Sequence, residues 1–227
     1  MAIRRQQTSH ITVFRRTDPA AVTYDLSSAD YVTITVPVGS TWTSGPHWHE
    51  THTEFLQILQ GRAFVKLGGR SGVYRAEDGA IEVPRCTVHE WHRVAGDDDG
   101  GDLVVREWTM PSDGQKEIFF RMLNSFLTEA HPSSLYTPPA MIPRWVTKWV
   151  EHWIVTLQLF CIFDSWDNWP VLIGNDNGWV SWAVTHLVLR VASAIAFVLG
   201  LRGTYSAYVN DELLQRASQD NGPKKTR

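Results

Sequence analysis

The chain has 227 residues, of which 43% are hydrophobic and 20% are charged, a balance typical of a folded rather than a disordered protein. Its formal net charge of −3 gives no reason to expect a nucleic-acid partner. The length allows one ordinary domain with a sizeable extension.

The N-terminal residues lack the apolar core that a secretory signal needs, because the short run Ile11–Phe14 is bracketed by arginines. The two cysteines, Cys86 and Cys161, lie in very different surroundings and imply no disulfide framework. We therefore expect an intracellular protein, cytoplasmic or associated with an intracellular membrane, that is not secreted.

Short β-branched and aromatic runs fill residues 1–112 and are separated by breaks that contain glycine and proline. Many short strands with this punctuation are typical of a β-sandwich or jelly-roll-like barrel. Strands are predicted at Ile11–Arg15, Val22–Leu26, Tyr31–Val36, Glu54–Leu59, Arg62–Leu67, Val73–Arg75, Ala80–Val83, Val88–Arg93 and Leu103–Thr109.

The apolar period becomes helical after the barrel. A helix is predicted over Gln115–Glu129, within a segment spanning 113–131, with Asp113 as its N-cap. We expect this helix to pack on the outside or one end of the barrel. Residues 132–143 contain four prolines and form a linker that cannot be helical throughout.

The region 144–210 is apolar and rich in tryptophan, with seven of the 11 tryptophans of the chain. Helices are predicted at Trp145–Phe163 and Trp179–Leu201, and the second has the length of a membrane span. Residues 211–227 are polar and are expected to form a disordered tail.

Two interpretations of these helices stay open. They pack on the barrel or at a dimer interface, or they lie on or cross a membrane with tryptophans at its interface. Arg190 is costly inside lipid, yet length and the tryptophan start favour membrane association through residues 145–201. We also expect a homodimer.

The chemically informative segment is His47-Trp-His49, followed by Glu54. Two histidines at i and i+2 on a strand point to the same face, and Glu54 opens the next strand after a short turn. His89 stands at the start of another strand. Because imidazoles and one carboxylate suit a divalent first-row metal, His47, His49, Glu54 and His89 are the predicted ligands.

This pattern resembles the cupin superfamily, whose first motif reads His-x-His, three or four residues, Glu, six residues, Gly. Its second motif runs from a glycine through a proline to a histidine. The matching residues are His47, His49, Glu54 and Gly61 for the first motif and Gly79, Pro84 and His89 for the second. The resemblance covers about residues 31–110 and implies a single-domain cupin barrel with one metal ion.

Three positions depart from the cupin motifs. Thr41 and Cys86 stand where glycines are expected, and Arg93 stands where asparagine is common. The thiol of Cys86 would lie near the metal in one interpretation. The favoured interpretation is that Cys86 is a small, buried hydrophobic side chain.

Strand alternation also predicts the surroundings of the metal. Trp91 and Arg93 share the strand face of His89, so both are candidate pocket or catalytic residues. Arg93 would anchor a carboxylate, carbonyl or phenolate, or it would form a structural ion pair with Glu90 or Glu107.

The strand that Glu54 opens would contribute the pocket wall. Leu56, Ile58 and Gln60 follow Glu54 inward and would give an apolar wall with one polar group, which suits a hydrophobic or aromatic substrate. His52, on the turn between the ligands, is a weaker candidate for a contact with them.

The stretch Trp108–Arg121 resembles fungal secondary-metabolism cupin-domain proteins that have a hydrophobic C-terminal extension. We predict a metal-dependent enzyme for a small, largely apolar organic metabolite, namely an oxygenase or dioxygenase with iron(II). With zinc, manganese or nickel, a non-redox lyase, isomerase, decarboxylase or cyclase is the alternative. A non-catalytic small-molecule-binding cupin and a membrane scaffold are the remaining ones.

Overall fold

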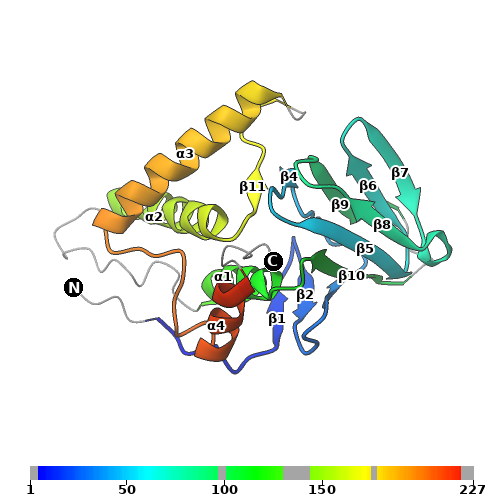
Figure 1. The fold of residues 1–227 in the computed structure, drawn as a ribbon, viewed down its shortest axis with the longest axis horizontal. Coiled ribbons are helices and arrows are strands. Elements are labelled where there is room, and N and C mark those ends of the chain that lie inside the picture. Colours follow the sequence, from blue (N-terminus) through cyan, green and yellow to red (C-terminus); the bar gives the residue numbers. More distant parts are fainter. Residues whose placement is uncertain (1–4, 97–100, 130–143, 175–177, 221–227) are drawn as a thin grey trace, which may run out of the picture.

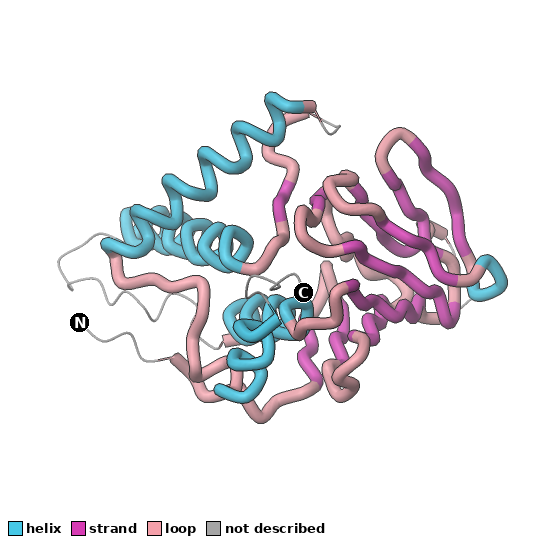
Figure 2. The backbone as a smooth tube through the Cα atoms, viewed as in Figure 1, coloured by secondary structure: helices cyan, strands magenta, loops and turns pink. Residues whose placement is uncertain are grey.

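The computed structural model describes residues 5–96, 101–129, 144–174 and 178–220. Within these residues the strands gather on one side of the molecule and the long helices on the other (Figures 1 and 2). The expected linker at 132–143 and the last seven residues of the expected tail lie outside the described residues.

Ten strands of the barrel region and one from the C-terminal region form two antiparallel sheets. The first sheet has the order β1 (Val13–Arg16), β2 (Val22–Asp25), β3 (Val32–Val36), β10 (Leu103–Met110), β5 (Thr53–Gln60) and β8 (Ala80–Val83). The second has the order β11 (Trp169–Pro170), β4 (His47–Trp48), β9 (His89–Arg93), β6 (Ala63–Leu67) and β7 (Arg70–Tyr74). A 3-10 turn at Ala76–Asp78 joins β7 to β8. The predicted mainly-β class, with helices after the sheets, is confirmed.

The two sheets share one hydrophobic core because every second side chain of their strands points inward. Buried and half-buried residues alternate along β3, β9 and β10. Ile34 and Ile58 from the first sheet and Val65 and Trp91 from the second belong to one buried cluster. This period of two is the one from which the sequence predicted the strands.

Helix α1 (Gln115–Thr128) covers one end of this core, as predicted. Ile118, Met122 and Phe126 are completely buried, and they belong to the barrel core. The N-cap is Gly114, at φ 89°, rather than Asp113. Asp113 lies one residue earlier and still accepts a hydrogen bond from the Gln115 backbone N–H, at 2.9 Å.

Three further helices follow, namely α2 (Arg144–Ser165), α3 (Trp179–Val198) and α4 (Asp211–Asp220). Helix α3 packs along α2, and α4 packs on α1 through the buried Leu213 and Ala217 (Figure 1). Residues 211–220 were expected to be disordered, but they form α4, because two apolar residues one turn apart give this polar segment a buried side.

The C-terminal region is attached to the second sheet. Trp169 and Pro170 of β11 pair with Trp48 and His47 of β4. Trp169 is buried in a small cluster with Trp48 and Leu189. Among the described residues, α3 is the one helix long and apolar enough to cross a membrane. The contact with the barrel is therefore present, whereas membrane association stays a proposal.

Candidate metal centre

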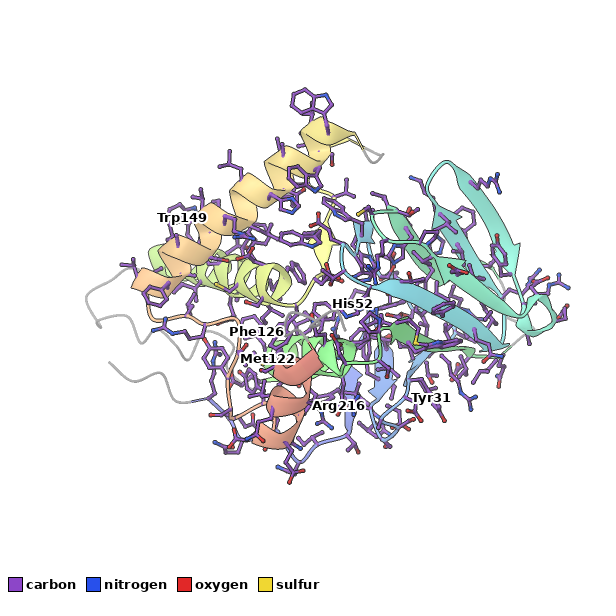
Figure 3. All side chains as sticks on the ribbon, in the orientation of Figure 1. Tyr31, His52, Met122, Phe126, Trp149 and Arg216 are labelled. Atoms are coloured by element: carbon purple, nitrogen blue, oxygen red, sulfur yellow. The ribbon has the colours of Figure 1, made fainter. Side chains whose placement is uncertain are left out.

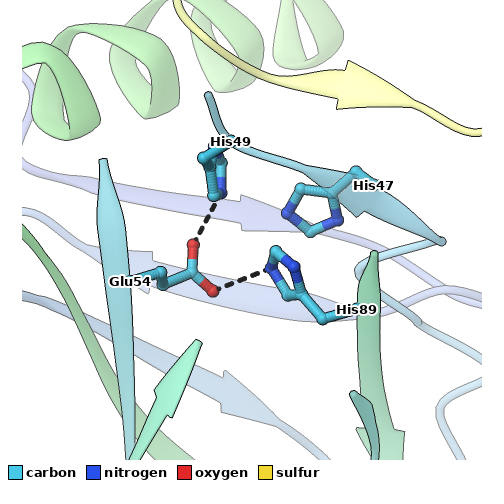
Figure 4. A group of neighbouring side chains, drawn as sticks. All are labelled: His47, His49, Glu54 and His89. Carbon is cyan, nitrogen blue, oxygen red and sulfur yellow. Dashed lines mark hydrogen bonds and ion pairs between the residues drawn. The ribbon is translucent and has the colours of Figure 1, made fainter. Parts of the chain in front are cut away.

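The four predicted ligands meet in the interior of the protein (Figure 4). His47, His49, Glu54 and His89 are all buried, and one candidate ligand atom from each lies within 4.8 Å of the others. His47 on β4 and His89 on β9 are register partners, and their ring centroids are 4.2 Å apart. Glu54 enters from the other sheet, at the start of β5. The pairing of β4 with β9 therefore completes the cluster.

Each histidine of the cluster is oriented by a backbone carbonyl. The Nδ1 atoms of His47, His49 and His89 lie 2.8, 2.5 and 3.1 Å from carbonyl oxygens. Those oxygens belong to Gly45, Asp167 and Thr87, in that order. Since a carbonyl oxygen only accepts, each Nδ1 donates, and Nε2 is left as the ligand atom.

The ionisation of the cluster suits a metal site. Burial lowers the pKa of His49, and it lowers that of His47 well below its usual value, where His89 and His49 add to the effect. Burial opposes ionisation of Glu54 too, but the charge of Lys116 and the contributions of His89 and His49 together outweigh it and bring the pKa of Glu54 well below its usual value. Neutral imidazoles beside an ionised carboxylate are the forms that bind a divalent ion. The donor set therefore fits a metal.

The Glu54 carboxylate lies close to two imidazole nitrogens that carry no proton in this tautomer, an arrangement that suits a positive ion between them. Glu54 Oε2 lies 2.8 Å from His49 Nε2, and its Oε1 lies 3.1 Å from His89 Nε2 (Figure 4). Lys116 from α1 forms an ion pair with Glu54 and a second one with Glu107 of β10. Burial, with the Glu54 charge added, raises the pKa of Glu107 to about 7.

Sequence reasoning missed Lys116 as part of the site and considered Glu107 only as a partner of Arg93. A signal for Lys116 does exist in the helical period. Lys116, Phe119, Phe120, Leu123 and Leu127 follow the spacing of one helix face, and all five line the same cavity. A lysine on an otherwise apolar face indicates a buried partner of opposite charge.

A cavity of about 220 Å³ lies against the cluster, between the barrel and the helices. His47, Glu107 and Lys116 stand in its wall. Phe119 and Phe120 of α1, with Phe163 of α2, contribute to its apolar side. One end of the cavity is thus polar and borders a candidate ligand, while the helices supply much of the remaining cavity wall.

The predicted pocket residues lie elsewhere. Trp91 is 1% exposed and packs edge-on against Trp42, so Trp42, not Trp91, lines the cavity. Arg93 is buried and donates from Nη1 to the carbonyl oxygen of Gly101, at 2.5 Å. Arg93 is not among the residues that line the cavity. A position on the same strand face as His89 is therefore not sufficient to place a residue in the cavity wall.

The other predicted wall residues are not in the cavity wall either. Leu56 and Ile58 are buried in the core between the sheets, and Gln60 is exposed. Cys86 is exposed rather than buried. Its φ of 58° lies in the left-handed region, which explains why the cupin motif has glycine at this position.

His52, which is labelled in Figure 3, contacts the carboxylates of two aspartates. Its Nδ1 lies 2.9 Å from Asp167 Oδ2, and its Nε2 lies 3.2 Å from Asp113 Oδ2. Burial opposes protonation of His52, but hydrogen bonds and charges of the two aspartates raise its pKa to about 9.

This pKa predicts a pH-dependent stability. The contribution of protonated His52 to stability is complete below about pH 6.5, the pKa of histidine in the unfolded chain, and is lost as the pH rises through about 9. This contribution to the free energy of unfolding is on the order of 3 kcal/mol. In metal-free protein, the stability gap between wild type and His52→Gln should therefore shrink between pH 6 and pH 9.5. Chemical denaturation at both pH values measures it, and an unchanged gap would contradict the charged pairing.

No family model matches the chain. It is similar to a protein of Hypocrea virens named probable oxidoreductase virH, with 26% identity over 132 residues, covering 48% of this chain and 59% of that protein. The chain thus aligns with less than two thirds of this relative.

Solved structures that it resembles have low identity to it. A predicted oxalate decarboxylase from Thermotoga maritima is 20% identical, with a TM-score of 0.34, over 48% of this chain and 97% of that one. KdgF from Halomonas is 21% identical, with a TM-score of 0.32, over 42% and 85%. CapF from Staphylococcus aureus is 18% identical, with a TM-score of 0.34, over 43% and 30%. By its own two sheets, its motifs and its buried cluster, the chain is a protein of the cupin fold.

Proposed function

We propose that the chain is a metal-dependent oxidoreductase that acts on a small, largely apolar organic molecule. The observation that carries the proposal is the buried cluster of three histidines and one glutamate beside a cavity of about 220 Å³. His47 belongs to both the cluster and the cavity wall, so a molecule in the cavity would lie close to an ion held by the cluster. The name of the Hypocrea virens relative agrees with an oxidoreductase.

The four side chains would hold one divalent ion. Iron(II) at this site would supply oxygenase chemistry, whereas zinc, manganese or nickel would supply Lewis-acid chemistry. We favour iron(II) and a dioxygenase reaction.

The residues of the chain prepare the cavity for its substrate. Phe119, Phe120 and Phe163 exclude water and contact the apolar body of the molecule. Lys116 and Glu107 border the same cavity and are suited to contact a hydroxyl, enolate or phenolate oxygen. When Glu54 binds an ion, the charge of Lys116 is less completely neutralised, which favours an anionic oxygen at this end.

Oxygen uptake tests the proposed reaction. Metal-free protein is loaded with iron(II) and mixed with a panel of phenols and enolisable ketones, and Glu54→Gln protein is treated identically. We expect oxygen consumption by the wild type alone, with at least one compound. Turnover under strict anaerobiosis, with zinc or manganese loaded, would instead support the lyase, isomerase, decarboxylase or cyclase alternative. Binding without turnover under either condition would support a non-catalytic cupin.

A second observation supports membrane association. The outer face of α3 has a continuous apolar stripe of residues between 46% and 84% exposed, namely Val180, Leu187, Val191, Ile195 and Val198. The opposite face is buried, with Leu189 packed in the cluster of Trp48 and Trp169 and Ala196 packed against α2. We propose that α3 lies in the plane of a membrane surface, because one of its faces is occupied by protein.

Exposed tryptophans on α2 and α3 are a separate observation. Trp179 and Trp182 at the start of α3 are exposed, and so is Trp149 of α2 (Figure 3). Aromatic side chains of this kind favour the membrane–water interface.

Sedimentation with lipid vesicles separates this proposal from a homodimer. We expect the wild type to sediment with the vesicles and the double variant Leu187→Glu/Val191→Glu to stay in solution. If instead the wild type does not bind the vesicles and is a dimer in solution, while the double variant is a monomer, the stripe is the homodimer interface.

A further inference from the structure

The segment that follows α2 reaches back to the loop between two of the candidate ligands. The backbone carbonyl of Asp167 accepts the hydrogen bond from His49 Nδ1, at 2.5 Å. The carboxylate of Asp167 accepts backbone N–H groups of Glu50 and Thr51, at 2.8 and 2.9 Å. One residue from the C-terminal region therefore orients a ligand and holds the chain directly after it.

The same carboxylate binds the side chains of this loop. It accepts from Thr51 Oγ1 at 2.6 Å and contacts His52 Nδ1 at 2.9 Å, and it also accepts from Nε1 of Trp169 in β11 at 3.1 Å. Residues 49–52, which lead from His49 towards Glu54, are fixed as a unit. No described residue of the barrel itself supplies the contact to His49 Nδ1.

The backbone of Asp167 is itself unusual, with φ 46° in the left-handed region. Non-glycine residues keep this conformation only when their surroundings hold them in it. Next to it, β11 pairs with β4, which places Pro170 opposite His47. The Val171 backbone N–H also donates to the Pro46 carbonyl, at 2.9 Å. The C-terminal region thus supports both histidines of the first motif.

We propose that Asp167 is a positioning residue of the metal centre, and that the C-terminal region completes a site which the barrel alone holds in a looser arrangement. The inference assumes the metal site of the proposed function. The hydrogen bond from His49 Nδ1 to the backbone carbonyl of Asp167 selects the tautomer of His49 and the orientation of its ring. The carboxylate of Asp167 keeps the loop at the required distance from Glu54. Partners of this kind change metal affinity by about 10–100-fold.

Metal titration of the full chain tests the proposal. Metal-free wild type, Asp167→Ala, Asp167→Asn and Asp164→Ala are titrated with cobalt(II), and both the dissociation constant and the visible absorption spectrum are recorded. Asp164→Ala is the matched control, since Asp164 lies three residues earlier and pairs with the exposed Arg190 at 2.9 Å.

We expect Asp167→Ala to bind cobalt(II) about 10–100-fold more weakly, with an altered spectrum. Asp167→Asn keeps one acceptor oxygen and should fall between wild type and Asp167→Ala, while Asp164→Ala should match the wild type. Circular dichroism identifies any variant that does not fold, and in that case Asp167→Asn decides. Wild-type affinity and spectrum in the folded Asp167 variants would overturn the proposal. A wild type that binds no cobalt(II) would overturn the proposed metal site itself.

Discussion

Replacing Lys116 with methionine is expected to destabilise the metal-free protein by about 3–5 kcal/mol, because removal of one partner leaves buried charges without compensation. Lys116 forms ion pairs with Glu54 and Glu107, and both carboxylates are buried. Methionine has a similar length and keeps the contact with Phe120, so the loss is mainly electrostatic.

The effect of Lys116→Met should depend on metal. A divalent ion bound at the cluster would compensate the negative charge of Glu54 in place of the Lys116 ammonium group. The substitution should therefore destabilise the metal-loaded protein less than the metal-free protein. The double variant Lys116→Met/Glu107→Gln should recover part of the stability, since it removes one of the two unpaired carboxylates. Denaturant unfolding with and without metal measures these differences. A metal-free Lys116→Met protein as stable as the wild type would show that the buried ion pairs contribute nothing.

Replacing Glu54 with glutamine is expected to weaken binding of a divalent ion by more than about 100-fold. Loss of a residue that only hydrogen-bonds a metal ligand already lowers metal affinity by up to about 100-fold, and Glu54 is itself a candidate ligand. The amide has nearly the same shape as the carboxylate, but it lacks the negative charge that a hard divalent ion requires. Calorimetric titration of metal-free protein with manganese(II) measures the change.

A matched variant shows whether this loss is specific to the cluster. Glu50→Gln changes a carboxylate four residues earlier, whose Oε1 accepts from Trp182 Nε1 at 2.7 Å and which is not one of the candidate ligands. Its affinity for manganese(II) should equal that of the wild type. If Glu54→Gln bound manganese(II) as tightly as Glu50→Gln, the carboxylate would not be a ligand.

The barrel was predictable because strand alternation and motif spacing are local properties of the sequence. The strand expected at Ala80–Val83 and the helix expected from Gln115 match β8 and α1. His47, His49, Glu54 and His89 come together because the first three are close in sequence and the pairing of β4 with β9 brings in the fourth. The spacing of the cupin motifs encodes this pairing.

The contributions of the C-terminal region were not predictable in this way. Asp167 is 118 residues from His49, and β11 has only two residues, too few to show a period. A pairing of this kind depends on tertiary packing rather than on local propensity. Strand alternation placed Trp91 and Arg93 on the buried side of β9, where both are found, but it could not tell which buried residues border the cavity.

Metal analysis of the full chain, purified without added metal or chelator, tests the central claim most directly. The wild type should contain close to one divalent ion per chain, and the double variant Glu54→Gln/His89→Ala, prepared in parallel, should contain almost none. If the folded wild type holds no more metal than the double variant, and takes up none on titration, the cluster is not a metal centre.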